Sequence, residues 1–299
     1  MMENLNYSVR NMKEDDIPAI IDLYKNEKWL DGYYNLYVWS QFDPEGFKVA
    51  ESYQGDIIGT CFGIRQDEKL ATIGGYVVKK ELRGKGIGKK LWAACLQHIE
   101  NRKATINGEG EAWKMYYKTG DFPIIENEWR FLMHHTDDEI NSKNLSSNLP
   151  ADVTIQPFSE TDLEAICCYD SSLLGFDRKF VLHKLFLMHE TRTFVAFKRQ
   201  KCVGYGCIQP NIYGGSFIAP LYADDPAVAE TLLKTLIDSF PSKKSFEIST
   251  SSGNKICRDL LKKLNCMFET DECVRLYRNE RFSTNLNSVY GLFIDYSPF

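Results

Sequence analysis

Apolar residues in the first part of the chain follow two different periods, and each period predicts a different kind of element. Ile57–Arg65 and Ala71–Val78 are apolar runs rich in β-branched and small residues, which is typical of buried strands. Apolar residues then recur at the spacing of one helix face, at Leu91, Trp92, Cys95, Leu96 and Ile99. Residues 71–100 therefore predict a strand, a connecting loop and an amphipathic helix.

Segments on either side of this unit extend the order of elements. An early helix has its apolar face at Ile17, Ile20, Ile21 and Tyr24. Phe47–Glu51 and Ile57–Arg65 flank Gln54-Gly55-Asp56, which predicts a hairpin. Ala104–Asn107 is expected to be a short strand and Glu109–Thr119 a helix. The predicted order is strand, helices, hairpin, strand, loop, helix, strand and helix.

The connecting loop, Arg83-Gly84-Lys85-Gly86-Ile87-Gly88, has glycine at alternate positions and opens the predicted helix. The first N–H groups of a helix have no intrahelical partners and carry the positive end of its dipole, so they attract anions. Glycine lets a phosphate approach the backbone without a Cβ in the way. Residues 79–90 include six basic side chains, Lys79, Lys80, Arg83, Lys85, Lys89 and Lys90. The loop is predicted to bind a pyrophosphate, and the alternative is a solvated turn.

Three phosphate-binding motifs compete for this loop. A P-loop requires Gly-Lys-Ser/Thr after a set spacing, and Gly86 and Gly88 have no such partners. A dinucleotide fingerprint requires Gly-x-Gly-x-x-Gly, whereas the glycines here are evenly spaced. The pattern Arg-x-x-Gly-x-Gly at 83–88 resembles the acyl-CoA motif of the GNAT N-acetyltransferase family. This resemblance extends over residues 5–135.

The resemblance implies acetyl-CoA as the acyl donor and suggests where it binds. In the GNAT family the strand before the loop carries a bulge, and the backbone of Tyr76, Val77 and Val78 would pair with the pantetheine arm and polarise the thioester carbonyl. The side chains of these three residues are equally consistent with a plain strand core. The pyrophosphate would be held by Arg83, Gly84, Lys85, Gly86, Ile87, Gly88 and Lys89.

A tyrosine is the expected catalytic acid. GNAT proteins place a tyrosine four residues before the glycine that ends the next helix, and counting back from Gly120 gives Tyr116. A phenol has a reference pKa of about 10, so it can donate a proton to the departing thiolate at neutral pH. The asparagine that the family often carries seven residues earlier is Glu109 here. The alternative role of Tyr116 is that of a packed aromatic residue.

The length and the order of elements indicate two similar halves. A polar stretch, Thr136–Asn148, is followed by Pro150 and is typical of a linker. Val49-Ala50 leads through a hairpin to Gly59-Thr60-Cys61, and Val195-Ala196 leads to Gly204-Tyr205-Gly206 in the same way. We therefore expect an α/β (α+β) fold of two tandem GNAT-like domains, 1–135 and 151–299 with the linker 136–150, each a mixed, mostly antiparallel sheet flanked by helices.

The second half is expected to lack the cofactor. Its counterpart of the Gly-rich loop is Ala223-Asp224-Asp225-Pro226, in which Asp225 suits a helix N-cap and Pro226 the first turn. Carboxylates at this position would repel a pyrophosphate. The same spacing that gives Tyr116 in the first half gives Leu261 in the second, counted from Asn254. The second half is interpreted as a structural partner that helps to wall the substrate cleft.

The general base and the acceptor are not fixed by the sequence. Family members often use a glutamate on the strand before the loop, but Ala71–Val78 contains no carboxylate. Glu68, Glu109, Glu111, a water chain or a second-half residue such as Asp170 remain as alternatives, and a carboxylate of this kind is more often a solvated surface charge. The aromatic segment Trp29–Trp39 would form the acceptor side of the cleft, where Asp31 and aromatic rings would suit a small amine. Core packing between the halves is the alternative for this segment.

Composition narrows the class of protein. The net charge of −5 does not favour nucleic-acid binding, and no run of residues is apolar enough for a membrane helix. The N-terminal residues do not resemble a signal peptide, so a cytoplasmic location is expected. The nine cysteines and five histidines show no metal-binding spacing, and reduced buried thiols are expected.

These observations favour an acetyl-CoA-dependent N-acetyltransferase that transfers an acetyl group directly to a primary amine of a small molecule in a ternary complex. A second interpretation is a non-catalytic acyl-CoA-binding regulatory or scaffold protein. A third is a protein or peptide acetyltransferase, which would require an open acceptor groove. The oligomeric state is left open, with a homodimer as one alternative.

Overall fold

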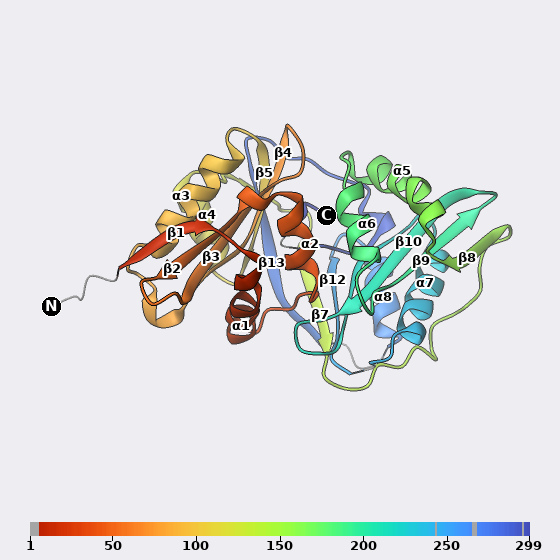
Figure 1. Cartoon of the computed structure of the whole chain (residues 1–299). Helices are drawn as coiled ribbons and strands as arrows, with labels where there is room; N and C mark the ends of the chain where they lie inside the picture. Colours follow the sequence, from red (N-terminus) through yellow and green to blue (C-terminus); the bar gives the residue numbers. More distant parts are fainter. Residues whose placement is uncertain (1–5, 243, 265–267, 295) are drawn as a thin grey trace.

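The computed structural model describes residues 6–242, 244–264, 268–294 and 296–299, and its strands form one continuous sheet (Figure 1). The order along this fourteen-stranded sheet is β1-β2-β3-β4-β5-β13-β7-β12-β11-β10-β9-β8, with β6 paired to β13 and β14 paired to β11. Most neighbours are antiparallel, while β4–β5 and β11–β12 are parallel. The mixed, mostly antiparallel sheet predicted from the sequence is confirmed.

The first half contains, in chain order, β1 (Tyr7–Asn11), α1 (Ile17–Glu27), α2 (Asn35–Phe42), β2 (Phe47–Ser52), β3 (Ile57–Arg65), β4 (Leu70–Val78), α3 (Ile87–Ile99), β5 (Lys103–Glu109), α4 (Ala112–Thr119), β6 (Ile124–Ile125) and β7 (Phe131–Thr136). The predicted hairpin, strands and helices of this half are present. The helix expected over Glu109–Thr119 begins at Ala112, because β5 continues to Glu109 in its pairing with β13.

The second half repeats this order with β8 (Val153–Pro157), α5 (Leu163–Leu174), α6 (Lys179–Phe186), β9 (Arg192–Lys198), β10 (Lys201–Pro210), β11 (Ser216–Ala223), α7 (Pro226–Ser239), β12 (Phe246–Ser251), α8 (Lys255–Lys262), β13 (Phe268–Arg278) and β14 (Val289–Gly291). The structure has no helix or strand between β7 and β8. The division of the chain into the domains 1–135 and 151–299 with a linker 136–150 stays a prediction. In the structure, the strands of both halves belong to one sheet.

The two halves exchange their last long strands. β13 lies between β5 and β7, and β7 pairs in turn with β12. Each half of the sheet is thus completed by a strand from the other half, and the strand order is symmetric about the β13–β7 pair. Figure 1 shows β7, β12 and β13 in the middle of the molecule, with α3 and α4 at one end and α7 and α8 at the other.

β4 and β5 separate after a short parallel pairing. They pair from Leu70 opposite Lys103 to Ile73 opposite Ile106, and no further. Gly75 then has φ +56°, and a Cβ there would lie 2.5 Å from the Tyr24 hydroxyl. Only glycine adopts this backbone with that neighbour so close. Beyond the paired residues, β4 and β5 diverge and leave a gap in the sheet.

The corresponding gap in the second half is filled by the chain itself. β11 pairs with β12 over Ser216–Ile218, and beyond that point it pairs with β14. Leu221 lies opposite Gly291 and Tyr222 opposite Val289. The space between β11 and β12 is therefore closed by a strand of the same protein.

Separate apolar clusters cover the two faces of the first half of the sheet. Tyr76 and Val78 pack with α3 and α4, whereas Val77 points to the opposite face and packs with α1 and α2. The cluster around α1 and α2 continues into α5 and α6 of the second half, and α7 and α8 have a cluster of their own. The halves are thus joined by packing as well as by the sheet.

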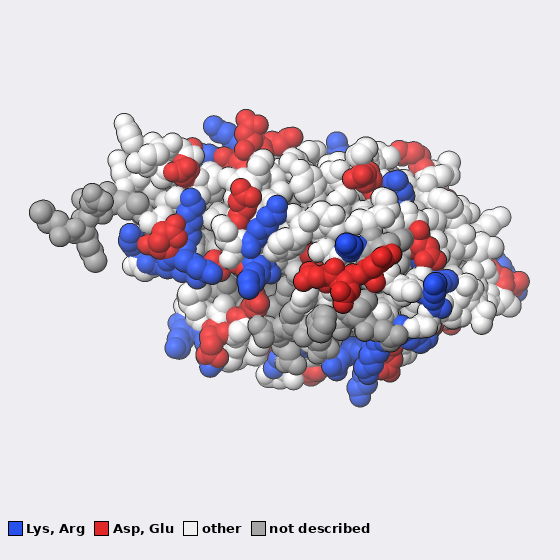
Figure 2. Space-filling view, turned by 90° about the horizontal axis from the view of Figure 1, so that it is seen from below, with Lys and Arg blue, Asp and Glu red and all other residues white. Residues whose placement is uncertain are grey.

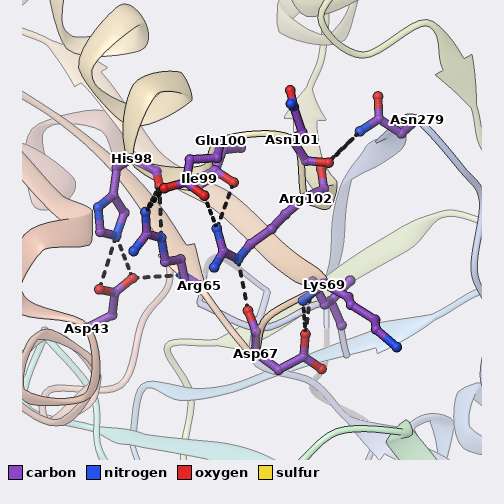
Figure 3. Close-up of polar contacts among 11 residues, drawn as sticks. Asp43, Arg65, Asp67, Lys69, His98, Ile99, Glu100, Asn101, Arg102 and Asn279 are labelled. Atoms are coloured by element: carbon purple, nitrogen blue, oxygen red, sulfur yellow. Dashed lines mark hydrogen bonds and ion pairs between the residues drawn. The ribbon is translucent and has the colours of Figure 1, made fainter.

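A polar cluster fixes the C-terminal end of α3 (Figure 3). Asp43 Oδ2 lies 2.9 Å from His98 Nε2 and accepts the backbone N–H of Arg65 at 2.8 Å. The Arg65 guanidinium donates to the His98 carbonyl oxygen at 2.8 Å and to the Glu100 carboxylate at 2.8 Å. These bonds hold α3 against β3 at the end opposite the Gly-rich loop.

The loop between α1 and α2 is attached to the second half. The Tyr33 N–H donates to the Pro210 carbonyl at 2.7 Å, and the Ile212 N–H donates to the Asp31 carbonyl at 3.1 Å. The Tyr34 N–H donates to the side-chain oxygen of Gln209 at 3.0 Å. A Cβ on Gly32 would lie 2.5 Å from the Gln209 side chain, so the two segments fit closely only with glycine at this position.

Two carboxyl groups are buried at this junction. The Asp31 carboxylate accepts from Asn35 Nδ2 at 2.6 Å and from the Tyr296 hydroxyl at 2.5 Å. Glu247 of β12 is 2% exposed, and burial raises its pKa well above the ordinary value, with the charge of Asp31 raising it further. Burial of Glu247 therefore favours its neutral acid form over the carboxylate.

Replacing Glu247 by glutamine is expected to stabilise the protein in a pH-dependent way. A carboxyl whose pKa is raised by folding binds more protons when folded, so its contribution to stability falls as the pH rises above its ordinary value of 4.5. Glu247→Gln should raise the melting temperature at about pH 8 and change it little near pH 5, as measured by thermal denaturation. The exposed Glu45→Gln is the control, and an equal shift at both pH values would contradict the assignment.

Candidate functional site

A cavity of about 1060 Å³ occupies the gap between β4 and β5. Its walls include residues from both faces of the sheet, because Val78, Trp92 and Tyr116 belong to the α3–α4 face while Val77 and Met133 belong to the opposite face. The cavity therefore passes through the sheet. The predicted site residues that line it are Tyr76, Val77, Val78, Arg83, Gly84, Gly86, Ile87, Gly88, Lys89 and Tyr116, whereas Lys85 is exposed and does not line it.

The Gly-rich loop forms one end of this cavity. Gly84 and Gly86 have φ of +78° and +84°, and no atom lies within 4 Å of a Cβ built at either position. Gly86 precedes the first residue of α3, so the unpaired N–H groups of the first helical turn are directed to this open space. Figure 2 shows Lys and Arg side chains gathered on the part of the lower face that belongs to the first half, which also contains the basic run 79–90.

Glycine is required at position 88 for a different reason than at positions 84 and 86. A Cβ at Gly88 would lie 2.2 Å from the Tyr76 hydroxyl, so the first turn of α3 is in contact with the tyrosine of β4. Burial raises the pKa of Tyr76 to about 12, which keeps this phenol neutral. The Tyr76 side chain thus sets how closely α3 approaches β4.

Arg83 joins the loop to two other segments. Its Nε donates to the Val78 carbonyl at 2.9 Å, and its Nη2 donates to the Glu27 carboxylate at 2.7 Å. The Arg83 side chain is half exposed. In this structure the guanidinium therefore connects the Gly-rich loop to the end of β4 and to the end of α1.

Three aromatic rings line the cavity at the centre of the α3–α4 face. The Tyr116 ring stacks on the Trp92 ring with centroids 5.5 Å apart and an interplanar angle of 3°, and its centroid lies 6.2 Å from that of Tyr76. Trp92 Nε1 donates to Asp121 at 2.8 Å. Tyr116 is buried, whereas its neighbour Tyr117 is 46% exposed. Trp92, expected from helical spacing to be a core residue, is also part of the cavity wall.

The opposite end of the cavity is mostly apolar and is assembled from distant segments. Trp29 and Leu30 come from the loop after α1, Met133 from β7, Cys273 from β13 and Ile294 from the segment after β14. The predicted aromatic segment Trp29–Trp39 includes Trp29 and Leu30, whereas the other three residues were not predicted from the sequence. No local pattern marks Met133, Cys273 or Ile294, because their position depends on the strand exchange.

The candidate carboxylates differ in where they lie. Of the four carboxylates suggested as the general base, Glu109 lines the cavity. Asp170 is buried in the second half, where Arg178 donates to it at 2.7 Å and 2.8 Å. Glu111 forms an exposed ion pair with Lys114, and Asp31 does not line the cavity, being held by Asn35 and Tyr296. The prediction that Asp31 forms the acceptor wall is therefore wrong, because that carboxylate is used within the junction.

In the second half, the positions that correspond to the Gly-rich loop and to the strand gap are occupied by the chain itself. The Asp225 carboxylate accepts the Ala227 N–H at 2.8 Å and caps α7, with Pro226 in its first turn, as predicted. The Tyr169 hydroxyl donates to Asp224 at 3.0 Å. Leu261, the residue that sequence spacing gives as the counterpart of Tyr116, is buried on α8, and β14 occupies the strand gap.

No group of three or more His, Cys, Asp or Glu side chains in the described part of the chain could hold a metal ion. The described cysteines are free thiols, mostly buried, as expected, and Cys266 lies outside the described residues. None of the described helices combines the length and apolar character needed to span a membrane.

Models of known protein families match the two halves of the chain separately. A model of the acetyltransferase (GNAT) family matches residues 14–120, and a model of an acetyltransferase (GNAT) domain matches residues 166–291. The holothin acyltransferase of Pseudoalteromonas sp. (strain SANK 73390) is 23% identical over 255 residues, which is 85% of this chain and 82% of that protein. The uncharacterised N-acetyltransferase YitH of Bacillus subtilis (strain 168) is 26% identical over 174 residues, 57% of this chain and 58% of its own.

Solved structures show the same fold over nearly the whole chain. A protein from Pyrococcus horikoshii, assigned to the acetyltransferases, superimposes with a TM-score of 0.73 at 19% identity, covering 98% of this chain and 96% of its own. A tandem GNAT protein from the clavulanic acid biosynthesis pathway gives a TM-score of 0.64 at 13% identity, covering 92% and 98%. Two matching domain models, the shared fold and the acyltransferase relatives lead to one conclusion. The chain belongs to the GNAT acetyltransferase family and is an N-acetyltransferase of this type with two GNAT domains in tandem.

Proposed function

We propose that the protein transfers an acetyl group from acetyl-CoA to a primary amine of a small molecule, by direct transfer in a ternary complex. The observation that carries this proposal is the cavity that passes through the sheet between β4 and β5. A cofactor entering from the α3–α4 face and an acceptor entering from the α1–α2 face would meet at the gap. Direct transfer requires both substrates to be bound at once, and this arrangement would allow it.

The α3–α4 face suits acetyl-CoA. The open loop at Gly84 and Gly86 and the first turn of α3 offer N–H groups and basic side chains to the pyrophosphate. Beyond Ile73, β4 has no ladder bonds to β5, so an extended pantetheine arm can add to its edge through backbone amides. Backbone N–H groups near Tyr76 and Val77 would then polarise the thioester carbonyl.

The reaction needs an acid for the sulfur atom that leaves. The amine nitrogen attacks the thioester carbon, the C–S bond breaks, and the thiolate of CoA takes a proton. Tyr116 lines the cavity on the α3–α4 face, where this thiolate would lie, and is our candidate for the donor. The proton lost by the nitrogen passes to water or to Glu109, the exposed carboxylate at the end of β5.

The second half would take no cofactor. Asp225 caps α7 where the first half has its open loop, and β14 occupies the gap next to β11. Its role in the proposal is to complete the acceptor side of the first site through β13 and Ile294. The relative named for acylation of holothin supports a small-molecule acceptor.

Blocking the Gly-rich loop is expected to abolish cofactor binding. Calorimetric titration of the wild-type protein with acetyl-CoA should give one site per chain. Gly86→Asp introduces a side chain and a negative charge into the open space before α3, and should weaken binding by at least about 100-fold. Gly55→Asp is the matched control, because Gly55 has φ +91° and equally open surroundings in the β2–β3 turn. Two sites per chain, or equal binding by both variants, would contradict the proposed site.

Removing one hydroxyl tests the proposed acid. Tyr116→Phe keeps the ring stacked on Trp92 but cannot donate a proton, so kcat should fall by roughly 100-fold or more while the Kd for acetyl-CoA changes little. The measurement is thiol release with an amine panel, beside calorimetry. Tyr117→Phe on the same helix is the control, since that residue is exposed and does not line the cavity. An unchanged kcat in Tyr116→Phe would remove Tyr116 from the mechanism.

A further inference from the structure

The part of the cavity on the α1–α2 face indicates a class of acceptor. We infer that this compartment, lined by Trp29, Leu30, Val77, Met133, Cys273 and Ile294, binds an amine whose body is apolar, and that Ile294 and Met133 limit its length. The inference rests on the proposed acetyl transfer and concerns the acceptor class, which neither the family nor the relatives fix.

The walls of the acceptor compartment disfavour a hydrated, charged group of the acceptor molecule. Val77, Met133, Cys273 and Ile294 are each less than 9% exposed, and Cys273 Sγ lies 4.0 Å from Met133 Sδ. The compartment therefore offers closely packed apolar surface. Transfer of a second ammonium group into such surroundings is unfavourable unless a partner ion is present.

The acidic residues of the cavity wall either lie outside the acceptor compartment or are bound to another side chain. Glu27 holds Arg83 at 2.7 Å beside the Gly-rich loop. Asp121 accepts the Trp92 indole N–H at 2.8 Å, on the face that would hold the cofactor. Glu109 ends β5 and is exposed at the surface. An acceptor would thus reach the thioester with its amino group first and leave its body among apolar side chains.

Contacts from both halves fix the shape of the acceptor compartment. The Ile294 carbonyl accepts from Asn107 Nδ2 at 2.6 Å, and Asn107 Oδ1 accepts from Arg275 at 3.1 Å. The Trp29 carbonyl accepts from the Tyr213 hydroxyl at 3.0 Å, and its ring packs on Tyr24 with centroids 4.9 Å apart. A rigid apolar compartment discriminates by size, since each methylene that fits contributes roughly fourfold to binding and one that does not fit is rejected.

The experiment compares amines from n-propylamine to n-octylamine with hexamethylenediamine, using acetyl-CoA and thiol release. In the wild-type protein, kcat/KM should rise roughly fourfold per methylene to a maximum and then fall. We expect n-hexylamine to exceed the equally long hexamethylenediamine by at least about tenfold. Preference for the diamine would overturn the inference. Preference for hexanoyl-CoA over acetyl-CoA would also overturn it, because the compartment would then serve the acyl chain.

Two variants test the length limit. Ile294→Ala should move the maximum to a longer amine, raising kcat/KM for n-octylamine at least about fourfold, with the KM for acetyl-CoA unchanged. Ile140→Ala makes the same change at a buried isoleucine that does not line the cavity, and should leave the length profile as in the wild type. An unshifted maximum in Ile294→Ala would contradict the role of Ile294.

Calorimetry with N-alkylacetamides, the product class, separates this inference from the proposed function. One outcome is binding of the alkylacetamides that depends on chain length and is shifted by Ile294→Ala, with no turnover of any amine. That outcome would support the apolar compartment and overturn acetyl transfer to amines. Turnover of polyamines with no binding of alkylacetamides would sustain the transfer and overturn the apolar compartment.

Discussion

The separation of β4 from β5 is the constraint on which the site depends. The bend of β4 begins at Gly75, where the positive φ and the neighbouring Phe62 and Tyr24 side chains leave no room for a Cβ. Past this point, alternate residues of β4 face two different compartments, one bordered by α3 and α4 and the other by α1 and α2. The same strand therefore contributes its backbone to the gap and its side chains to both sides of it.

The second half shows another arrangement of the same gap. Its β11 separates from β12 in the same manner, but β14 pairs with the free edge and an aspartate caps the following helix. Unpaired backbone groups inside a protein are unfavourable, so a gap in a sheet is stable only when something occupies or solvates it. In one half the chain supplies that partner, and in the other the opening remains accessible.

Local features of the site could be predicted from the sequence, whereas the features that assemble it could not. The Gly-rich loop, α3 and the place of Tyr116 follow from short-range spacing, and the repeat of elements predicted the second domain. The exchange of β7 and β13 depends on pairing between segments far apart in the chain, which periodicity does not encode. Met133, Cys273 and Ile294 consequently could not be found, and Asp31 was misplaced because its partner Tyr296 lies 265 residues away.

The strand exchange has a consequence for how the protein is made. While the ribosome has synthesised only the first half, β5 has no β13 beside it, and β7 has no β12. Both edges then remain exposed until the last quarter of the chain emerges, and exposed strand edges favour association between molecules. The order of synthesis thus leaves two strand edges of the nascent first half without their partners, and the half that contains the cavity is completed only when the second half arrives.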